Sequence, residues 1–183
     1  MGMLDTVEVN PVSSVCEKVV PAERWYAACV RPRYERLVSR HLEQRGFHHL
    51  LPTYRSVRRW KDRRKELELP LFPGYIFVNM EAHARLGVLT APGVMHFVTF
   101  QGRLAAIEDS EIRSLELGVA GGTGVQPHPY LREGRKVRVK RGPLMGAEGI
   151  VIRRKERFRL VLSIHLIMRS VMFEVDESEV EPR

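Results

Sequence analysis

The feature that most constrains this chain is an uncharged stretch, rich in glycine and proline, about two thirds of the way along it. The stretch LGVAGGTGVQPHPYL spans Leu117–Leu131. Its composition is typical of a flexible linker. The sequence favours a linker over a phosphate-binding loop, because such a loop needs Lys-Ser/Thr and a helix after its last glycine, and Val-Gln-Pro follows here. We therefore expect a folding unit on each side.

The chain of 183 residues then divides into four parts. These are an acidic tail (1–23), a first domain (24–117), the linker (118–131) and a second domain (132–183). Both domains are long enough for a core of their own.

Residues 1–20 lack a basic start and an apolar centre, no apolar run could cross a membrane, and Cys16 and Cys29 have no metal or redox spacing. We expect a cytoplasmic protein with reduced thiols.

The first domain mixes helical and extended patterns. Trp25–Val30 predicts a strand, and Pro32 suits the first turn of a helix that Gly46 would end. Further extended segments follow, and a last helix capped by Asp109 or Ser110 is expected to run to Leu117. Helices interspersed with strands predict an α+β domain with an antiparallel sheet.

The second domain has the pattern of a small SH3-like β-barrel. Val137 and Val139 alternate with basic residues, a turn with three glycines spans residues 142–149, and further short extended segments follow. One alternative stays open. The segment Arg157–Phe173 contains no glycine or proline, and its composition suits a helix nearly as well.

Charge is distributed unevenly. The chain carries a net charge of +8, although its tail is acidic. Arg55–Lys65 holds seven basic residues and one acid between two strand-like segments. This arrangement predicts a projecting basic hairpin that could follow a phosphate backbone, with an ordinary solvated surface as the alternative.

The patterns of enzymes and metal sites are missing from the sequence. Neither Gly-x-Ser-x-Gly nor His-Glu-x-x-His occurs. His48 and His49 are adjacent on a predicted strand and would face opposite sides. Asp109 and Glu111 are better explained by the start of a helix than by acid–base catalysis. We expect no catalytic residues, no metal and no cofactor.

Several motifs, in their order and spacing, resemble the NusG family of bacterial transcription elongation factors. They are Trp25-Tyr26, PLFPGYIFV (70–78), APGVMHFV (91–98), IEDSEI (107–112) and VRVKRGPLMGAEGIV (137–151). The first domain resembles the NGN domain and the second the KOW domain. The KOW motif falls on Val139, Gly142, Pro143, Gly146, Gly149 and Val151. The basic stretch before PLFPGY is more similar to specialised paralogues of the RfaH, UpxY and LoaP type.

The resemblance implies a docking patch for the clamp helices of RNA polymerase. The matching positions are Tyr75, Phe77 and Phe97, with Cys29 at a strand position that is often aromatic in RfaH-like members. Tyr75 and Phe77 are two residues apart on a strand and so share a face; Phe97 is expected on that face too. An ordinary core role is the alternative. His83 and Arg85 match the segment that approaches a second part of the polymerase.

The resemblance to the NusG family also implies contact with non-template DNA at the upstream edge of the transcription bubble. The matching positions are Arg31, Arg33, Arg36 and His41. From charge and position we add the hairpin residues Arg58, Arg59, Lys61, Arg63 and Arg64. The implied function is elongation and antitermination on selected operons by a monomer that makes and breaks no bond.

The KOW domain is implied to bind Rho or a small-subunit ribosomal protein. Ile167-Met168-Arg169 stands where housekeeping members usually have Leu-Gly-Arg, which puts these contacts in doubt. The rival interpretation is a ribosome-associated RNA-binding protein that uses the KOW-type barrel. Whether the second domain ever covers the docking patch stays open at this point.

Overall fold

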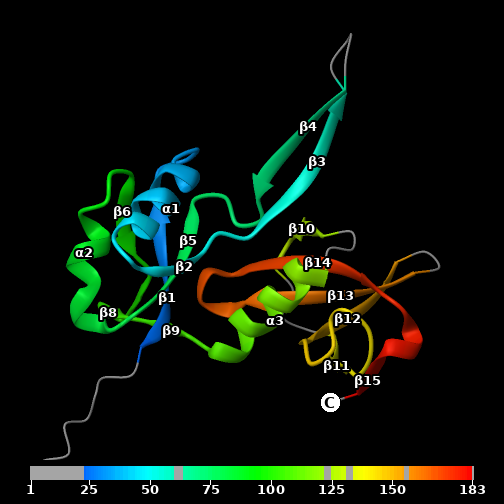
Figure 1. Ribbon diagram of the computed structural model, residues 1–183. Helices are drawn as coiled ribbons and strands as arrows, with labels where there is room; N and C mark the ends of the chain where they lie inside the picture. Colours follow the sequence, from blue (N-terminus) through cyan, green and yellow to red (C-terminus); the bar gives the residue numbers. More distant parts are fainter. Residues whose placement is uncertain (1–22, 60–63, 122–124, 131–133, 155–156, 183) are drawn as a thin grey trace, which may run out of the picture.

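The computed structural model describes residues 23–59, 64–121, 125–130, 134–154 and 157–182 (Figure 1). A sheet with two helices on one side forms the first domain, and a β-barrel forms the second. A two-stranded hairpin projects away from both, and helix α3 lies between the first sheet and the barrel. Within the described ranges, no helix has the length and apolar character needed to cross a membrane.

The first sheet is antiparallel throughout its described pairings. Its order is β2 (His48–Leu50), β5 (Tyr75–Met80), β1 (Arg24–Val30) and β6 (Val94–Phe97), and β9 (Ala106–Ile107) also pairs with β1. Side chains alternate between its two faces. One face packs against α1 (Glu35–Gln44) and α2 (Arg85–Leu89), in a core that includes Tyr26, Ala28, Ile76 and Val78. The predicted α+β class is confirmed.

Helix α1 forms because its apolar residues recur at helical spacing. Val38 and Leu42 are fully buried, and Gly46 adopts φ +74° just beyond the C-terminal end. The expected glycine stop is thus confirmed. The role given to Pro32 is wrong: it lies in a turn before the helix, because Arg33 takes a left-handed conformation (φ +70°) that no helix can continue.

The basic segment belongs to a hairpin that stands apart from the main sheet. Strands β3 (Thr53–Arg59) and β4 (Arg64–Pro70) pair in antiparallel register and form a sheet of their own. A smaller hairpin consists of β7 (Thr99–Phe100) and β8 (Arg103–Leu104). Figure 1 shows β3 and β4 extending well beyond the body of the first domain. The predicted projecting hairpin is therefore present.

Among the described residues, the barrel contains the five strands that the sequence predicts and one more, β10, from the expected linker. The order is β10 (Gln126–His128), β14 (Arg169–Val175), β13 (Arg157–Ile164), β12 (Glu148–Arg154), β11 (Arg135–Val139) and β15 (Val180–Pro182). The segment Arg157–Phe173 contributes two paired strands joined by a short 3-10 turn at His165–Ile167. The helical alternative for this segment is therefore wrong in this conformation.

Helix α3 (Asp109–Gly121) extends four residues further than the sequence predicts. The expected linker of residues 118–131 thus begins as helix and later supplies β10, which pairs with β14. A Cβ atom on Gly118 would lie 2.3 Å from the Phe173 ring, and one on Gly121 would lie 2.9 Å from Leu144. These two glycines allow close packing of α3 on the barrel instead of flexibility.

Candidate interaction surfaces

The face of the first sheet that points away from α1 and α2 carries three of the expected docking residues, Tyr75, Phe77 and Cys29. Ala27 pairs with Phe77, and Cys29 pairs with Tyr75 on one side and with His96 on the other. Paired residues in an antiparallel ladder point to the same side. The shared face that the sequence predicts for Tyr75 and Phe77 is confirmed.

The middle of this face is buried. Phe77 and Ala27 have no exposed surface, and Phe77 meets Phe72 edge to face with ring centroids 5.4 Å apart. These residues belong to one continuous apolar cluster that also includes Ile112 and Leu115 of α3 and the interior of the barrel. The expectation of an exposed docking patch is therefore wrong for Phe77 in this conformation, because α3 and the barrel share its core.

One edge of the same face remains accessible. Tyr75 and Cys29 are half-buried and His96 is exposed, and the three lie side by side across β5, β1 and β6. Burial raises the pKa of the Cys29 thiol, which keeps it protonated at neutral pH. His96 was not predicted. The register of β1 and β6 places it there, and no sequence pattern gives that register.

Phe97 lies on the opposite face. It pairs with Ala28, and its ring contacts Tyr26 in the core beneath α1 and α2, with centroids 6.4 Å apart. Its predicted place beside Tyr75 and Phe77 is wrong, because the register of β6 sets His96 and not Phe97 opposite Cys29. Phe97 is a core residue in this structure.

The segment expected to approach a second part of the polymerase belongs to the helix layer, on the other side of the first sheet from Tyr75. Nδ1 of His83 lies 2.9 Å from the Glu81 carboxylate, and the His83 side chain is largely exposed. Arg85 begins α2 and is exposed, as is its apolar neighbour Leu86. Both predicted residues are thus open to solvent, on a different surface from Tyr75.

The basic residues after the first strand divide into two kinds. Arg31 and Arg33 are exposed in the turn before α1, and His41 is half-buried on that helix. Arg36 instead donates hydrogen bonds to the carboxylate (2.8 Å) and the carbonyl oxygen (2.9 Å) of Glu68 in the hairpin. A hydrogen bond from Thr53, together with Arg36, lowers the pKa of Glu68. Arg36 therefore fixes the hairpin to α1.

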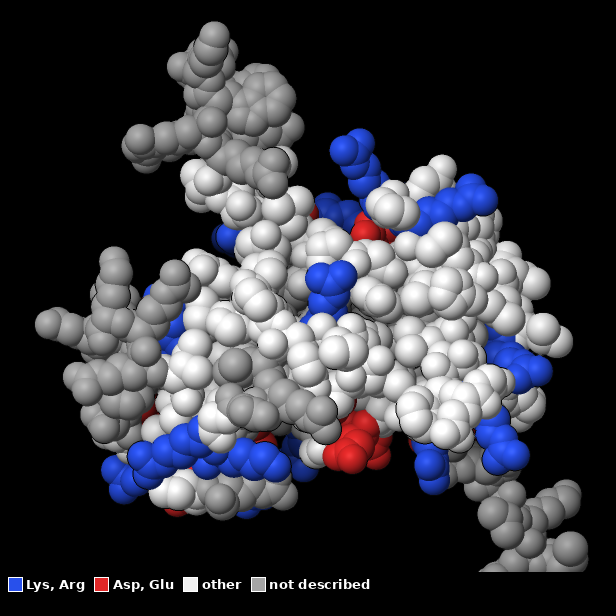
Figure 2. Space-filling view, turned by 180° about the vertical axis from the view of Figure 1, so that it is seen from behind, with Lys and Arg blue, Asp and Glu red and all other residues white. Residues whose placement is uncertain are grey.

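The hairpin residues are only partly described. Arg58, Arg59 and Arg64 lie in β3 and β4, and Lys61 and Arg63 lie outside the described residues. A groove of about 760 Å³ lies at the base of the hairpin, lined by Tyr54, Arg55 and Gln126 among others. Seen from behind, Lys and Arg also form a band over the lower part of the barrel (Figure 2). Basic charge is therefore present on both domains.

The KOW motif forms a hydrogen-bonded loop between β11 and β12. Gly142 and Gly146 have positive φ angles of +84° and +91°, and the Gly146 amide donates to the Val139 carbonyl at 2.8 Å. A Cβ atom on Gly149 would lie 2.5 Å from the Val161 carbonyl oxygen. Pro143 packs near Gly121 of α3, and Val151 pairs with Arg135 and Leu160. The glycines are required by backbone conformation and strand packing.

Ser39 and His49 form a pair that sequence reasoning missed. The Ser39 hydroxyl lies 2.7 Å from Nε2 of His49, and Nδ1 of His49 lies 3.1 Å from the Phe47 carbonyl oxygen. If Nδ1 donates to that carbonyl, Nε2 accepts the serine proton, as in a nucleophile–base pair. Neither residue lines the hairpin groove or the cavity at the α3–barrel junction. The contact joins α1 to β2 and is explained by packing.

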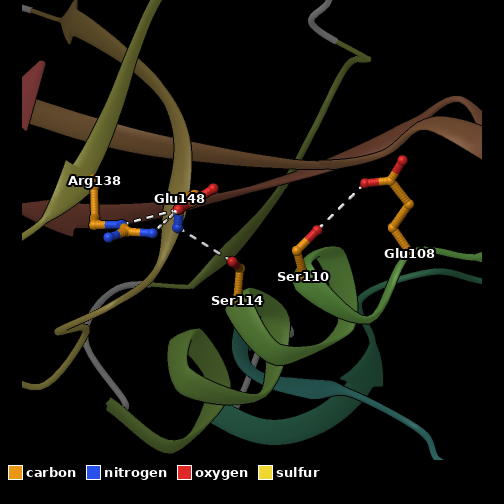
Figure 3. Close-up of polar contacts among 5 residues, drawn as sticks. All are labelled: Glu108, Ser110, Ser114, Arg138 and Glu148. Atoms are coloured by element: carbon orange, nitrogen blue, oxygen red, sulfur yellow. Dashed lines mark hydrogen bonds and ion pairs between the residues drawn. The ribbon is translucent and has the colours of Figure 1, made fainter. Parts of the chain in front are cut away.

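Polar contacts join α3 to the barrel. The Glu148 amide donates to Oγ of Ser114 at 3.1 Å, and Arg138 donates to the Glu148 carboxylate (Figure 3). One helical turn before Ser114, the Glu111 carboxylate accepts the His165 amide at 3.3 Å. The first domain and the barrel are therefore held together by specific contacts as well as apolar packing.

Comparisons with known proteins agree with this architecture, in which an α+β domain is followed by a small barrel. A family model described as "Transcription termination factor nusG" matches residues 23–116. The transcription termination/antitermination protein NusG of Pseudomonas aeruginosa is 30% identical over 174 residues, which cover 87% of this chain and 98% of that protein. NusG of Thermus thermophilus is 30% identical over 76% of this chain and 82% of that protein. The chain belongs to the NusG family of transcription termination and antitermination factors.

A solved structure gives the same picture of the fold. The structure titled "Domain interaction in Thermotoga maritima NusG" aligns with a TM-score of 0.50 at 23% identity, over 87% of this chain and 97% of that one. At this identity the likeness concerns the fold alone.

Proposed function

We propose that this protein is an elongation and antitermination factor that binds the clamp helices of RNA polymerase and non-template DNA at the upstream edge of the bubble. It acts on selected operons, as a specialised paralogue, and catalyses no reaction. The first domain would bridge the polymerase cleft and favour the closed clamp by binding that state more tightly. His83 and Arg85 would meet the second side of the cleft.

The observation that carries the proposal is the sheet face with Tyr75, Cys29 and His96 at its accessible edge. An amphipathic surface in which an aromatic ring lies beside small and polar groups is typical of protein interfaces. Its apolar centre around Phe77 continues under α3 and the barrel. Movement of the barrel would extend the surface available to a polymerase helix.

We expect the double substitution Tyr75→Ala and His96→Ala to weaken binding of the full chain to core RNA polymerase about thirtyfold, the effect of losing one interface hot spot. Both side chains are at least partly exposed, so the fold should persist. Binding is measured with immobilised polymerase. Phe100→Ala is the matched control, since Phe100 is exposed on the separate β7–β8 hairpin. Equal affinities for the double variant and the control would rule out this surface.

The hairpin is proposed to contact the DNA phosphate backbone. Reversing Arg58, Arg59 and Arg63 to Glu is expected to weaken DNA binding. The binding constant should also depend less on salt, so that a plot of its logarithm against the logarithm of salt concentration has a shallower slope. If each residue meets one phosphate, the slope should decrease by about three. Arg113→Glu, an exposed change on α3, is the control. A slope that stays the same would make the hairpin an ordinary solvated surface.

The barrel is proposed to bind Rho or a small-subunit ribosomal protein once it is free of α3. The rival proposal, a ribosome-associated protein that binds RNA through its barrel, is favoured by the band of basic residues over that domain. The two differ in a simple measurement. Association with ribosomes and not with RNA polymerase in a pull-down would support the rival.

A further inference from the structure

The junction between α3 and the barrel unites three parts of the chain that are distant in sequence. Glu111 comes from α3, His165 from the turn between β13 and β14, and Tyr130 from the segment after β10. The Glu111 carboxylate accepts the His165 amide at 3.3 Å, and its oxygen lies 3.8 Å from Nε2 of the same histidine. On the other side of the ring, the Tyr130 hydroxyl lies 2.9 Å from Nδ1.

The face of α3 that meets the barrel includes small residues and one carboxylate beside its apolar side chains. Ser114, Gly118 and Gly121 lie along it at helical spacing from Glu111, and they contact Glu148, Phe173 and Leu144 respectively. Side chains of this size allow the helix backbone to approach the barrel closely. The barrel end is therefore shaped to receive one particular kind of helix face, which α3 supplies.

We propose that packing of the barrel on α3 is coupled to the uptake of a proton at their junction. The proton resides on Glu111, because its side chain is only 13% exposed, whereas that of His165 is 59% exposed. When the barrel leaves, the carboxylate returns to water and loses the proton.

The electrostatics around Glu111 support this assignment. Burial is the main cause that raises its pKa to about 7; the neighbouring Glu108 raises it as well, and the His165 amide lowers it. Other charged groups face the same cavity of about 430 Å³: Lys136 from β11 and Glu148 from β12, the latter held by Arg138. His165 is the only titratable group of the β13–β14 turn among the residues that line this cavity.

The direction of the pH effect follows from the raised pKa. A carboxyl whose pKa is about 7 in the closed state and near 4.3 in water binds its proton more tightly when closed. Opening therefore releases a proton between roughly pH 4.3 and 7, and the equilibrium constant for opening increases by up to about tenfold per pH unit in that window. Acidification holds the barrel on α3, and alkalinity above pH 7 gives no further opening.

The test uses the full-length chain without polymerase, so its result does not depend on the proposed function. Amide hydrogen exchange is followed by NMR at Glu148 and His165, whose amides donate to α3. After correction for intrinsic exchange, we expect their protection to fall by up to about tenfold per pH unit between pH 5 and 7. Protection of Leu160, in the barrel ladder, reports whether the barrel stays folded.

Glu111→Gln keeps the size and the acceptor oxygen but cannot titrate. We expect protection at Glu148 and His165 to persist in this variant and to be independent of pH, while Glu116→Gln, on the exposed side of α3, keeps the wild-type slope. An unchanged slope in Glu111→Gln would overturn the proposal. So would loss of protection at His165 at every pH with Leu160 still protected, because the contact would then require the ionised carboxylate. A wild-type chain without any slope would overturn it as well.

Discussion

Replacing Phe77 by alanine is expected to lower the free energy of unfolding of the first domain by about 3–5 kcal/mol, the usual cost of removing a buried phenylalanine. The ring has no exposed surface, packs edge to face on Phe72 and belongs to the cluster shared with α3 and the barrel. The cavity left behind is bordered by β1 and by Phe72, which cannot collapse into it without moving the sheet. Chemical denaturation followed by circular dichroism measures the change.

Phe100→Ala serves as the comparison, because this ring is 67% exposed and its loss should change stability by no more than about 0.5 kcal/mol. If Phe77→Ala were as stable as Phe100→Ala, the buried cluster would not exist in solution and the face would be open. The prediction also bears on function. Loss of polymerase binding by Phe77→Ala could come from unfolding alone, so Tyr75 and His96 are the informative positions.

Replacing Gly118 by leucine is expected to separate the barrel from α3 and to raise the affinity of the chain for RNA polymerase about tenfold or more, a typical coupling between two linked binding events. Even the Cβ atom of a new side chain would lie 2.3–2.9 Å from three atoms of the Phe173 ring. Leucine is a better helix former than glycine by nearly 1 kcal/mol, so α3 itself should persist. Small-angle scattering would report the separation, and polymerase binding the affinity.

Ala120→Leu is the matched control for Gly118→Leu, since it adds a similar side chain on the exposed side of the same helix. It should leave both the compact shape and the affinity unchanged. If Gly118→Leu separated the domains without any gain in polymerase affinity, the barrel would not compete with polymerase for the sheet face. If Gly118→Leu left the chain compact, the contact between α3 and the barrel would accommodate a leucine despite the close approach of Phe173. The prediction would then be wrong.

Local patterns predicted much of the fold because they reflect local physics. The apolar run Trp25–Val30 predicts a strand, in which Tyr26, Ala28 and Val30 lie beneath the helices, and Gly46 ends α1 by adopting a conformation that other residues avoid. The barrel strands could be placed by their alternation and by the glycines of the KOW loop. The basic hairpin followed from charge flanked by extended segments.

The remaining differences come from contacts between distant parts of the chain. Phe97 could be assigned to a strand, but its face depends on the register of β6 against β1, which tertiary packing decides. Gly118 and Gly121 have the composition of a linker, and only the approach of Phe173 and Leu144 reveals that they belong to a packed helix. The same holds for Arg36, whose partner Glu68 lies 32 residues away.

The shared position of α3 has a consequence for the order of events during synthesis. All strands of the first sheet and α3 itself are complete by Gly121, whereas the barrel needs most of the 62 residues that follow. At roughly 5–20 residues per second, translation of that remainder takes about 3–12 s. During this interval the nascent first domain has its proposed docking face without the barrel that later covers part of it. If the proposed function holds, a chain made beside a transcribing polymerase would therefore pass through an open form before it can close.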